Sequence, residues 1–215
     1  TAGLVGTLDS SGVIQNLTIQ NASVTGSDDL GVAVGINTGT VQNVTASGTV
    51  IGNDRIGGLV GTVNNGGVVT DATATAITNG SQSVGGLVGK SNGNGAVNNA
   101  SASGTVTASG QYAGGLIGDH HSTTPVTDVN ASGAVTGTSH IGGLIGRIEA
   151  NVINASAGGD VNGTSGNRVG GLIGAHRPNQ AAKITNVSAS GDVSASGNGV
   201  GGLVGHAKSS SGNPI

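Results

Sequence analysis

The chain has 215 residues, of which 44 are glycine, and it contains one Tyr but no Cys, Met, Trp or Phe. Seven basic against ten acidic residues give a net charge of −3, and without a basic patch or an aromatic platform a nucleic-acid partner is not expected. No apolar run approaches the roughly 18 residues of a membrane-spanning helix, so no membrane span is expected either.

The dominant feature is a short glycine-rich motif that recurs along the whole chain. Copies of Gly-Gly-Leu-Val/Ile-Gly occur within 56–61, 84–89, 113–118, 141–146, 169–174 and 200–205, and looser copies at 1–6 and 30–35. The closing glycines follow one another in steps of 29, 26, 28, 29, 28, 28 and 31 residues. A fixed period of this size is typical of a solenoid, since a propeller blade needs about 40 residues.

Between the motifs, short segments alternate apolar and polar residues. In Val187-Ser188-Ala189-Ser190 every second residue is apolar, which is the period of a half-buried strand. Glycine recurs too often for helices. We therefore predict an all-β fold, a parallel β-solenoid of about seven coils, with about 28 residues and three short strands in each coil. Residues 1–215 are expected to form one repeat domain, a segment of a larger exported protein, whose narrow interior is filled by Val, Ile, Leu and Ala.

A column of Asn and Asp marks one bend in every repeat. An apolar residue lies two positions before it and a small apolar residue directly after it. Strict alternation cannot bury both neighbours, so the chain must bend there, and Asn and Asp tolerate the left-handed conformation of a bend. Stacked coil on coil, these side chains are expected to form a ladder that satisfies an inner turn; the column comprises Asn16, Asn43, Asp71, Asn99, Asp128, Asn154 and Asn186.

The motif itself leaves one orientation open, because its Leu is adjacent to a Val or Ile. Glycine permits positive φ angles and close backbone approach, so one possibility is a bend that buries both side chains. The other possibility is an exposed apolar stripe that invites self-association. The candidate stripe comprises Leu59, Leu87, Leu116, Leu144, Leu172 and Leu203.

Two columns of hydroxyl-bearing residues follow the Asn/Asp column. Strand geometry places such columns about 6.8 Å apart and repeats them about every 4.8 Å, which makes a flat, ordered surface. This surface is a candidate binding face for ice or a glycan, although Ser and Thr are also simply small, soluble strand residues. Its candidate residues are Thr18, Thr45, Ser47, Thr73, Thr75, Ser101, Ser103, Ser188 and Ser190.

Charged and titratable residues are few. Lys90, Asp119 and Arg147 follow successive motifs and form an alternating ladder, expected to fix register and aid solubility. His120 and His121 are the one cluster that resembles a metal or acid/base site, and we expect them in a solvated turn. The other acids are dispersed, unlike the clustered carboxylates of carbohydrate-active enzymes on similar folds, so neither an enzyme nor a cofactor is expected.

The repeat unit resembles the GLUG motif, which is found in large bacterial surface proteins and in some IgA-specific peptidases. The resemblance spans essentially the whole chain, from Gly3 to Gly205. It implies an extracellular or bacterial cell-surface location and carries no catalytic residues. Val32 and Ala33 replace the expected Gly and Leu, so the coil at 30–35 is expected to be distorted.

Two functional hypotheses follow. The leading one is a structural or adhesive segment of an extracellular surface protein or filament, acting as a rigid stalk or as a unit that associates with itself, end to end or laterally. The alternative is a ligand-binding solenoid that uses the Ser/Thr columns for ice or glycan. Partners would then be a second copy of the chain or a ligand on a host or cell surface, with a glycan as one candidate. The sequence leaves the receptor and the handedness of the coil open.

Overall fold

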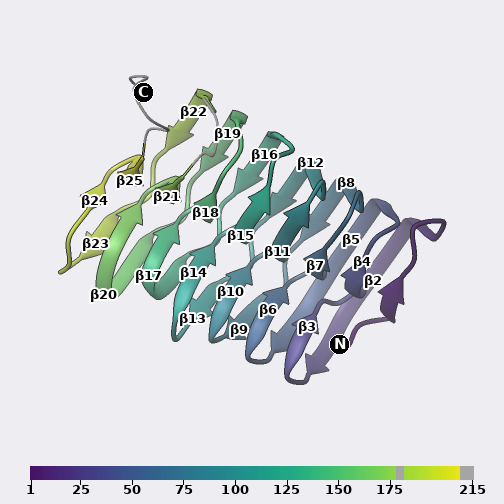
Figure 1. Cartoon of the computed structure of the whole chain (residues 1–215). Coiled ribbons are helices and arrows are strands. Elements are labelled where there is room, and N and C mark those ends of the chain that lie inside the picture. The colour runs from purple at the N-terminus through teal and green to yellow at the C-terminus, as the bar shows by residue number, and fades with distance from the viewer. Residues whose placement is uncertain (178–181, 209–215) are drawn as a thin grey trace.

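The computed structural model describes residues 1–177 and 182–208 and shows a parallel β-solenoid (Figure 1). Its strands wind through seven complete coils, with the first and last coils at opposite ends of a rod. No helix occurs in the described ranges, so none there is long and apolar enough to cross a membrane. The fold class predicted from the sequence is confirmed, as is the repeat of about 28 residues.

One side of the rod is a sheet of eight parallel strands. Each strand starts at or near the Val or Ile of a motif and pairs with the same position one repeat later, as Val60 pairs with Val88 and Val88 with Ile117. The strands are β1 (Val5–Leu8), β4 (Val34–Asn37), β7 (Val60–Val63), β11 (Val88–Gly93), β15 (Ile117–Ser122), β18 (Ile145–Ile148), β21 (Ile173–His176) and β25 (Val204–Ala207).

The remaining sides belong to one 17-stranded sheet that bends around the rod in three rows. The first row, which carries the Asn/Asp column, comprises β2 (Val13–Thr25), β5 (Thr40–Ile51), β8 (Val68–Ala74), β12 (Ala96–Ala102), β16 (Val126–Ala131), β19 (Val152–Ala157) and β22 (Ile184–Ala189). The second row comprises β9 (Ile77–Gly80), β13 (Val106–Ala108), β17 (Val135–Gly142), β20 (Val161–Gly170) and β23 (Val193–Ala195). The third row comprises β3 (Asp28–Leu30), β6 (Asp54–Gly57), β10 (Gln82–Gly85), β14 (Gln111–Gly114) and β24 (Val200–Gly201).

A coil contains three strands or four, depending on whether a strand continues around a corner. Strands β2 and β5 extend from the first row into the second, and β17 and β20 extend from the second into the third. The coils that contain these long strands therefore have three strands, as predicted. The coils that begin with β7, β11 and β21 have four, because no strand in them continues around a corner.

The glycine motif turns both of its apolar residues into the core. Leu172 and Ile173 are adjacent, yet both are fully buried, because the chain bends at Gly171 and Leu172. The carbonyl of Leu203 in the next coil accepts N–H bonds from Leu172 at 2.9 Å and from Ile173 at 3.0 Å. The same two-to-one pairing recurs at the carbonyls of Leu59, Leu87, Leu116, Leu144 and Leu172.

The candidate self-association stripe is therefore not a lateral surface. Leu59, Leu87, Leu116, Leu144 and Leu172 are 0% exposed, so the possibility that glycine bends the chain and buries both side chains is the correct one. Leu203 alone of the six is exposed, at 39%, because it lies in the last coil described. Exposed Leu of this motif thus occurs only at the ends of the described rod, at Leu4 and Leu203.

Close backbone contact explains why the corner uses two glycines. A Cβ on Gly115 would lie 2.1 Å from the carbonyl oxygen of Gly143 in the next coil, and one on Gly114 would lie 2.0 Å from the carbonyl oxygen of Ile117. Neither glycine has a positive φ. Of the two roles expected for glycine, only close approach applies at this corner.

The looser motif at 30–35 is distorted, as expected. Ala33 occupies the Leu position, and the N–H groups of Leu4 and Val5 donate to two different carbonyls, those of Val32 at 3.0 Å and Ala33 at 2.9 Å. In the next coil the two-to-one pairing on Leu59 is already restored. The irregularity is thus confined to the first corner of the rod.

We predict that Gly115→Ala lowers the free energy of unfolding by about 3 kcal/mol. The new Cβ would collide with the carbonyl oxygen of Gly143, and a backbone carbonyl cannot move aside by a change of rotamer. Gly202→Ala is the matched control, since it occupies the same motif position and a Cβ there meets nothing within 4 Å. Urea unfolding of the two variants provides the measurement. Equal losses would contradict the steric argument.

Candidate functional site

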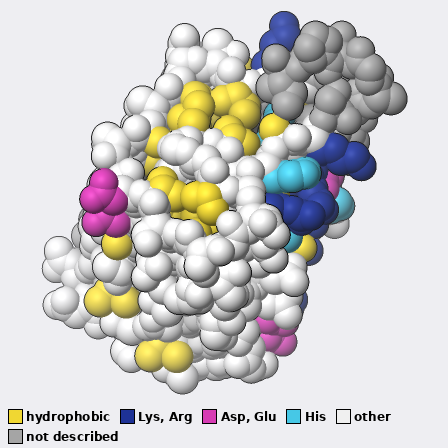
Figure 2. Space-filling model, turned by 90° about the vertical axis from the view of Figure 1, so that its left-hand side faces the viewer, with side chains coloured by type: hydrophobic (Ala, Val, Ile, Leu, Met, Phe, Trp, Pro, Cys, Tyr) yellow, Lys and Arg dark blue, Asp and Glu magenta, His cyan; other side chains and the backbone are white. Residues whose placement is uncertain are grey.

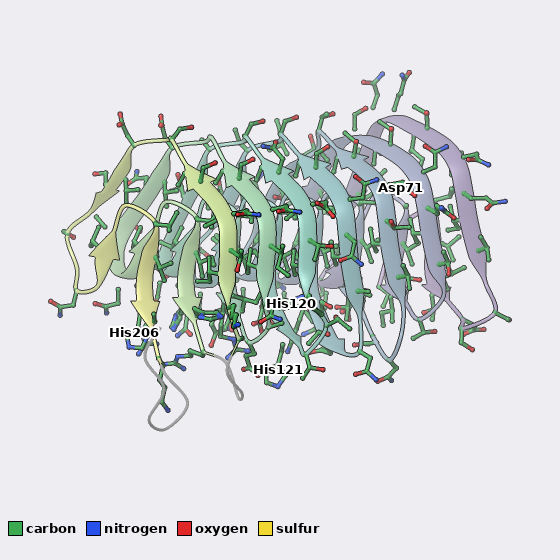
Figure 3. The ribbon with its side chains drawn as sticks, turned by 90° about the horizontal axis from the view of Figure 1, so that it is seen from above. Asp71, His120, His121 and His206 are labelled. Atoms are coloured by element: carbon green, nitrogen blue, oxygen red, sulfur yellow. The ribbon has the colours of Figure 1, made fainter. Side chains whose placement is uncertain are left out.

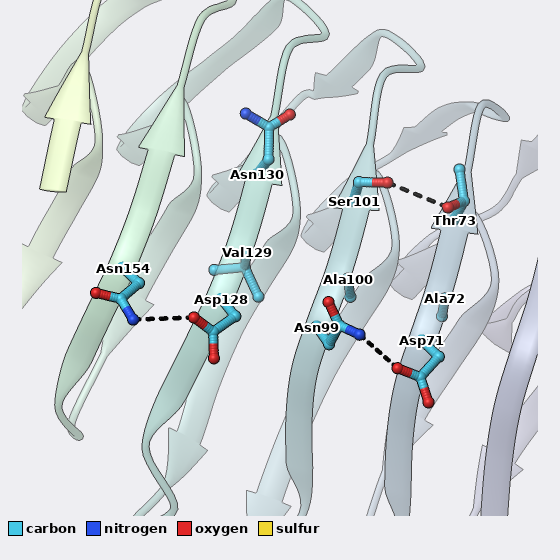
Figure 4. A pocket seen from close by; sticks show the side chains of 10 residues that line it. All are labelled: Asp71, Ala72, Thr73, Asn99, Ala100, Ser101, Asp128, Val129, Asn130 and Asn154. Carbon is cyan, nitrogen blue, oxygen red and sulfur yellow. Dashed lines mark hydrogen bonds between the residues drawn. The ribbon is translucent and has the colours of Figure 1, made fainter. Parts of the chain in front are cut away.

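The Asn/Asp column forms a hydrogen-bonded ladder on the outside of the first row. All seven residues are exposed and have φ between 45° and 56°. The Nδ2 of Asn154 donates to Oδ1 of Asp128 at 2.9 Å, and Asn99 donates to Asp71 (Figure 4). Similar bonds link Asn43 to Asn16 at 2.7 Å and Asn186 to Asn154 at 3.1 Å.

The expected bend is present, but the expected inward orientation is wrong. Left-handed backbone at Asn99 lets both Val97 and Ala100 enter the core, where they are 0% and 6% exposed. Asn99 itself is turned toward solvent. The side chains of the column therefore hydrogen-bond to one another on the surface, and they do not point into the inner turn.

A shallow groove of about 520 Å³ lies over this ladder. Its floor includes the buried Ala72, Ala100 and Val129, and its sides carry amides, carboxylates and the hydroxyls of Thr73 and Ser101 (Figure 4). The groove is polar and open. It follows the rod axis across four coils.

The candidate Ser/Thr face is accessible and aligned. Thr18, Thr45, Thr73 and Ser101 pair in register on successive coils, and the hydroxyls of Thr73 and Ser101 are 3.2 Å apart. Ser47, Thr73 and Ser101 are half-buried, whereas the exposed members are Thr18, Thr45, Thr75, Ser103, Ser188 and Ser190. The structure thus presents these hydroxyls together, and whether they bind a ligand stays a prediction.

The two adjacent histidines lie on strand β15, not in a solvated turn. His120 is 0% exposed, and its Nε2 is 2.9 Å from the carbonyl oxygen of Thr124. His121 is exposed, with Nδ1 2.8 Å from Glu149 (Figure 3). His176, two coils on, bonds the carbonyl of Ala150 at 3.2 Å. The buried histidines therefore satisfy turn carbonyls inside the rod, which is a structural role.

A second column of left-handed residues lies just before each motif, and sequence reasoning missed it. Its members have φ between 51° and 65° at the six non-glycine positions, and glycine occupies the seventh. Because the residue type changes from each coil to the next, no column is visible in the sequence, and the one signal is the glycine. The column comprises Asp29, Arg55, Ser83, Tyr112, His140, Arg168 and Gly199.

This second column faces the outward residues of the eight-stranded sheet, and together they form a line of polar side chains that we name the charged seam. Figure 2 shows its basic and histidine residues gathered along one edge of the molecule. The seam comprises Asp29, Arg55, Thr62, Lys90, Tyr112, Asp119, His140, Arg147, Arg168 and His206.

At its N-terminal end the seam is a carboxylate held by an arginine. The guanidinium of Arg55 bonds Asp29 through Nε at 2.7 Å and Nη2 at 3.1 Å, and Thr62 donates to the same carboxylate at 2.5 Å. Burial alone would raise the pKa of Asp29, but the hydrogen bonds from Arg55 and Thr62 outweigh it and hold that pKa below its usual value. Asp29 is therefore ionised near neutral pH.

The middle of the seam contains the ladder that the sequence predicted. Arg147 holds Asp119 through Nε at 2.7 Å and Nη2 at 2.8 Å, and Lys90 lies 3.9 Å from the same carboxylate. Asp119 is 1% exposed, so this is a desolvated pair and not a screened surface one. The guanidinium of Arg147 also lies 4.6 Å from the ring centre of Tyr112.

At the C-terminal end a directed chain of hydrogen bonds begins at Arg168. Nη1 of Arg168 donates to Nε2 of His140, so Nδ1 carries the proton of the neutral ring and donates to Oγ of Ser139 at 2.9 Å. Ser139 in turn donates to the carbonyl of Asn167 at 3.3 Å. Burial, followed by the charges of Arg168, Arg177 and Arg147, lowers the pKa of His140 to about 4.

A hollow of about 370 Å³ lies beside this chain. It is lined by Ser139, Asn167, Arg168, Asn198, Gly199 and His206. Across residues 1–177 and 182–208, no three metal-ligating side chains gather in one place. The polar groups of the seam thus bind one another or face this hollow.

Comparison with known proteins identifies the repeat. Residues 80–107, which contain one full motif with its flanks, match the GLUG motif. The chain carries the GLUG motif. The resemblance seen in the sequence is confirmed, and equivalent motif positions of the neighbouring coils pair with one another along the rod.

The chain is similar to one stretch of a much longer protein. Over 184 residues, 86% of this chain, it is 72% identical to Halomucin of Haloquadratum walsbyi, and that stretch is 2% of Halomucin's length. A crystal structure described as a candidate immunoglobulin A1 protease from Bacteroides ovatus matches with a TM-score of 0.65 and 21% identity, covering 95% of this chain and 62% of that one. The second match shows the fold alone.

We predict that Asn99→Gly leaves stability within about 0.5 kcal/mol, whereas Asn99→Val lowers it by about 2 kcal/mol. Glycine adopts the left-handed conformation freely, and a β-branched residue does not. Both variants remove the same side-chain hydrogen bond, so thermal unfolding separates the two contributions. Equal losses would show that the ladder bond, and not the backbone conformation, is what the column supplies.

We predict that the chain loses stability as the pH falls below about 6.5. Burial lowers the pKa of His120, His140 and His176 in the folded state, so the unfolded chain binds more protons in this range. The contribution of these histidines to stability is complete above pH 6.5. For His140 it is lost as the pH falls toward 4, and the total loss is on the order of 3 kcal/mol. Urea unfolding between pH 8 and pH 4 measures the slope, and His140→Gln should flatten it; an unchanged slope would contradict the assignment.

Proposed function

We propose that this chain is a rigid structural segment of an extracellular surface protein. The observation that carries the proposal is the continuous parallel pairing of seven coils, in which every internal strand bonds to a neighbour on each side. Similarity to Halomucin over most of the chain supports a surface location and a repetitive, structural role. The bacterial source implied by the resemblance is a further prediction.

Stiffness follows from how the coils contact one another. The backbones meet so closely at each Gly-Gly corner inside the rod that no Cβ fits, and the Leu carbonyl there bonds two N–H groups of the preceding coil. A bend of the rod would have to stretch several such bonds at once. The rod should therefore resist both bending and proteolysis, which suits a stalk.

The ends of the rod are the surfaces at which we propose self-association. Leu4 and Val13 in the first coil are 62% and 57% exposed, and Val200 and Leu203 in the last coil are 44% and 39% exposed. Equivalent Leu positions inside the rod are fully buried by the next coil. Apolar side chains beside unpaired strand edges favour pairing with another coil of the same kind, so we propose end-to-end contact with a second copy.

The side chains that first suggested chemistry have structural partners instead. His120 bonds a turn carbonyl, and Asp119 is held by Arg147 and Lys90. Asp71 and Asp128 accept bonds from the amides of the ladder. These contacts support a non-catalytic role without a cofactor.

A ligand-binding role for the Ser/Thr face is the second candidate. It is favoured by the register of Thr18, Thr45, Thr73 and Ser101 across four coils and by the groove beside them. A regular array of hydroxyls can match a repeating ligand such as ice or a glycan. Under this hypothesis the rod serves to hold the Ser/Thr face in a regular array.

Sedimentation and electron microscopy of the chain test the leading proposal. We expect straight particles that lengthen along one axis as concentration rises, and we expect Gly202→Ala to weaken this association at least tenfold, since a coil seated there would put a carbonyl about 2.1 Å from the new Cβ, as at Gly115. Flexible particles would contradict the rigid stalk, and monomers at all concentrations would contradict end-to-end contact. Thermal hysteresis or glycan-array binding that disappears in Thr45→Tyr and Thr73→Tyr would favour the second candidate instead.

A further inference from the structure

The arginines of the charged seam hold carboxylates through one particular edge. Arg55 binds Asp29 and Arg147 binds Asp119, and in both cases the bonds come from Nε and Nη2. This two-pronged geometry is the strong form of arginine–carboxylate recognition. The seam thus shows twice how it binds a carboxylate.

Arg168 has the same edge available. Within the described residues it takes part in no ion pair, and its one side-chain bond runs from Nη1 to His140. Nε and Nη2, the edge that the other two arginines use, have no partner there. Because His140 stays neutral down to about pH 4, it remains an acceptor that fixes the orientation of the guanidinium over the ordinary pH range.

The surroundings of Arg168 carry excess positive charge. His206 lines the same hollow, and its Nδ1 is buried without a hydrogen-bond partner. The charges that act on His206 come from Arg168, Arg177 and Lys208, all of them cations. The segments 178–181 and 209–215 contain no Asp or Glu in their sequences, so they supply no acidic side chain to neutralise this charge.

The remaining lining indicates the kind of molecule that would bring the carboxylate. Asn167 and Asn198 offer amides, Ser139 has a hydroxyl that already bonds His140 and Asn167, and none of the described lining residues has an apolar side chain. Peptide partners are usually anchored by apolar or aromatic side chains in pockets, and the described lining offers no such side chain to receive them. Amides and hydroxyls match the hydroxyl groups of a sugar, and a volume of about 370 Å³ is at the small end of ligand sites.

We propose that this hollow is a binding site for an acidic sugar, with the Nε–Nη2 edge of Arg168 holding the sugar carboxylate. His140 is the positioning residue that orients Arg168, and Asn167 and Asn198 supply hydrogen bonds to ring hydroxyls. A repeating rod with such a site would retain acidic polysaccharide at the surface on which it stands. The proposal does not depend on the rigid-stalk role, and failure of either leaves the other untouched.

Titration calorimetry with sodium glucuronate, glucose, sodium acetate and sodium sulfate tests the site in the whole chain. We expect glucuronate to bind at least tenfold more tightly than each of the other three, because only it offers both a carboxylate and ring hydroxyls. Arg168→Gln should weaken glucuronate binding at least tenfold, and Arg168→Lys should weaken it less. Arg55→Gln is the matched control, since that arginine is already occupied by Asp29, and it should leave binding unchanged.

Asn198→Asp provides a second test that does not depend on removing the arginine. It places a carboxylate in the hollow, so glucuronate binding should fall at least tenfold while the thermal unfolding curve stays within a few degrees of the parent. Equal affinity for acetate or sulfate would overturn the sugar assignment and leave a general anion site. Absence of glucuronate binding, or equal binding by the parent and a folded Arg168→Gln variant, would overturn the site itself.

Discussion

The contact between a Gly-Gly corner and the carbonyl of the next coil is the constraint on which the rest of this structure depends. Gly114 and Gly115 lie so close to backbone oxygens that no side chain fits, and this closeness lets one Leu carbonyl bond two N–H groups. Both apolar residues of the motif then point inward. A narrow interior follows, and Val, Ile, Leu and Ala fill it without any aromatic side chain.

Two left-handed corners complete each coil, and they have opposite consequences. At the first corner the side chain is always Asn or Asp, and the column bonds to itself on the surface. At the second corner the side chain changes from coil to coil, and its partners lie both in the same column and on the eight-stranded sheet. Arg55 and Arg168 bond to Asp29 and His140 of the preceding coil in that column. Tyr112 instead contacts Arg147 of the eight-stranded sheet.

The rod combines coils that repeat the same backbone contacts with a charged seam whose side chains differ along its length. Repetition supplies the same backbone contacts and a regular face in successive coils, within a stretch that is 72% identical to a small part of Halomucin. Variation at the second corner supplies local chemistry, with Asp29 and Asp119 each held by an arginine and Arg168 left available. A change of function between such segments would need only changes along the seam, because the scaffold residues lie elsewhere.

The sequence by itself determined the repeat, the strand-rich fold and the Asn/Asp bend, because each depends on residue types that return in a fixed phase. It left the direction of Leu172 open and placed the ladder on the wrong side, since orientation at a bend depends on the φ angle and not on the pattern alone. The tertiary structure decided both, through the shared carbonyl of Leu203 and the left-handed backbone at Asn99. It alone placed the rest of the charged seam beside the predicted Lys90–Asp119–Arg147 ladder, because Tyr112, His140 and Arg168 share no residue type and come together only when successive coils stack.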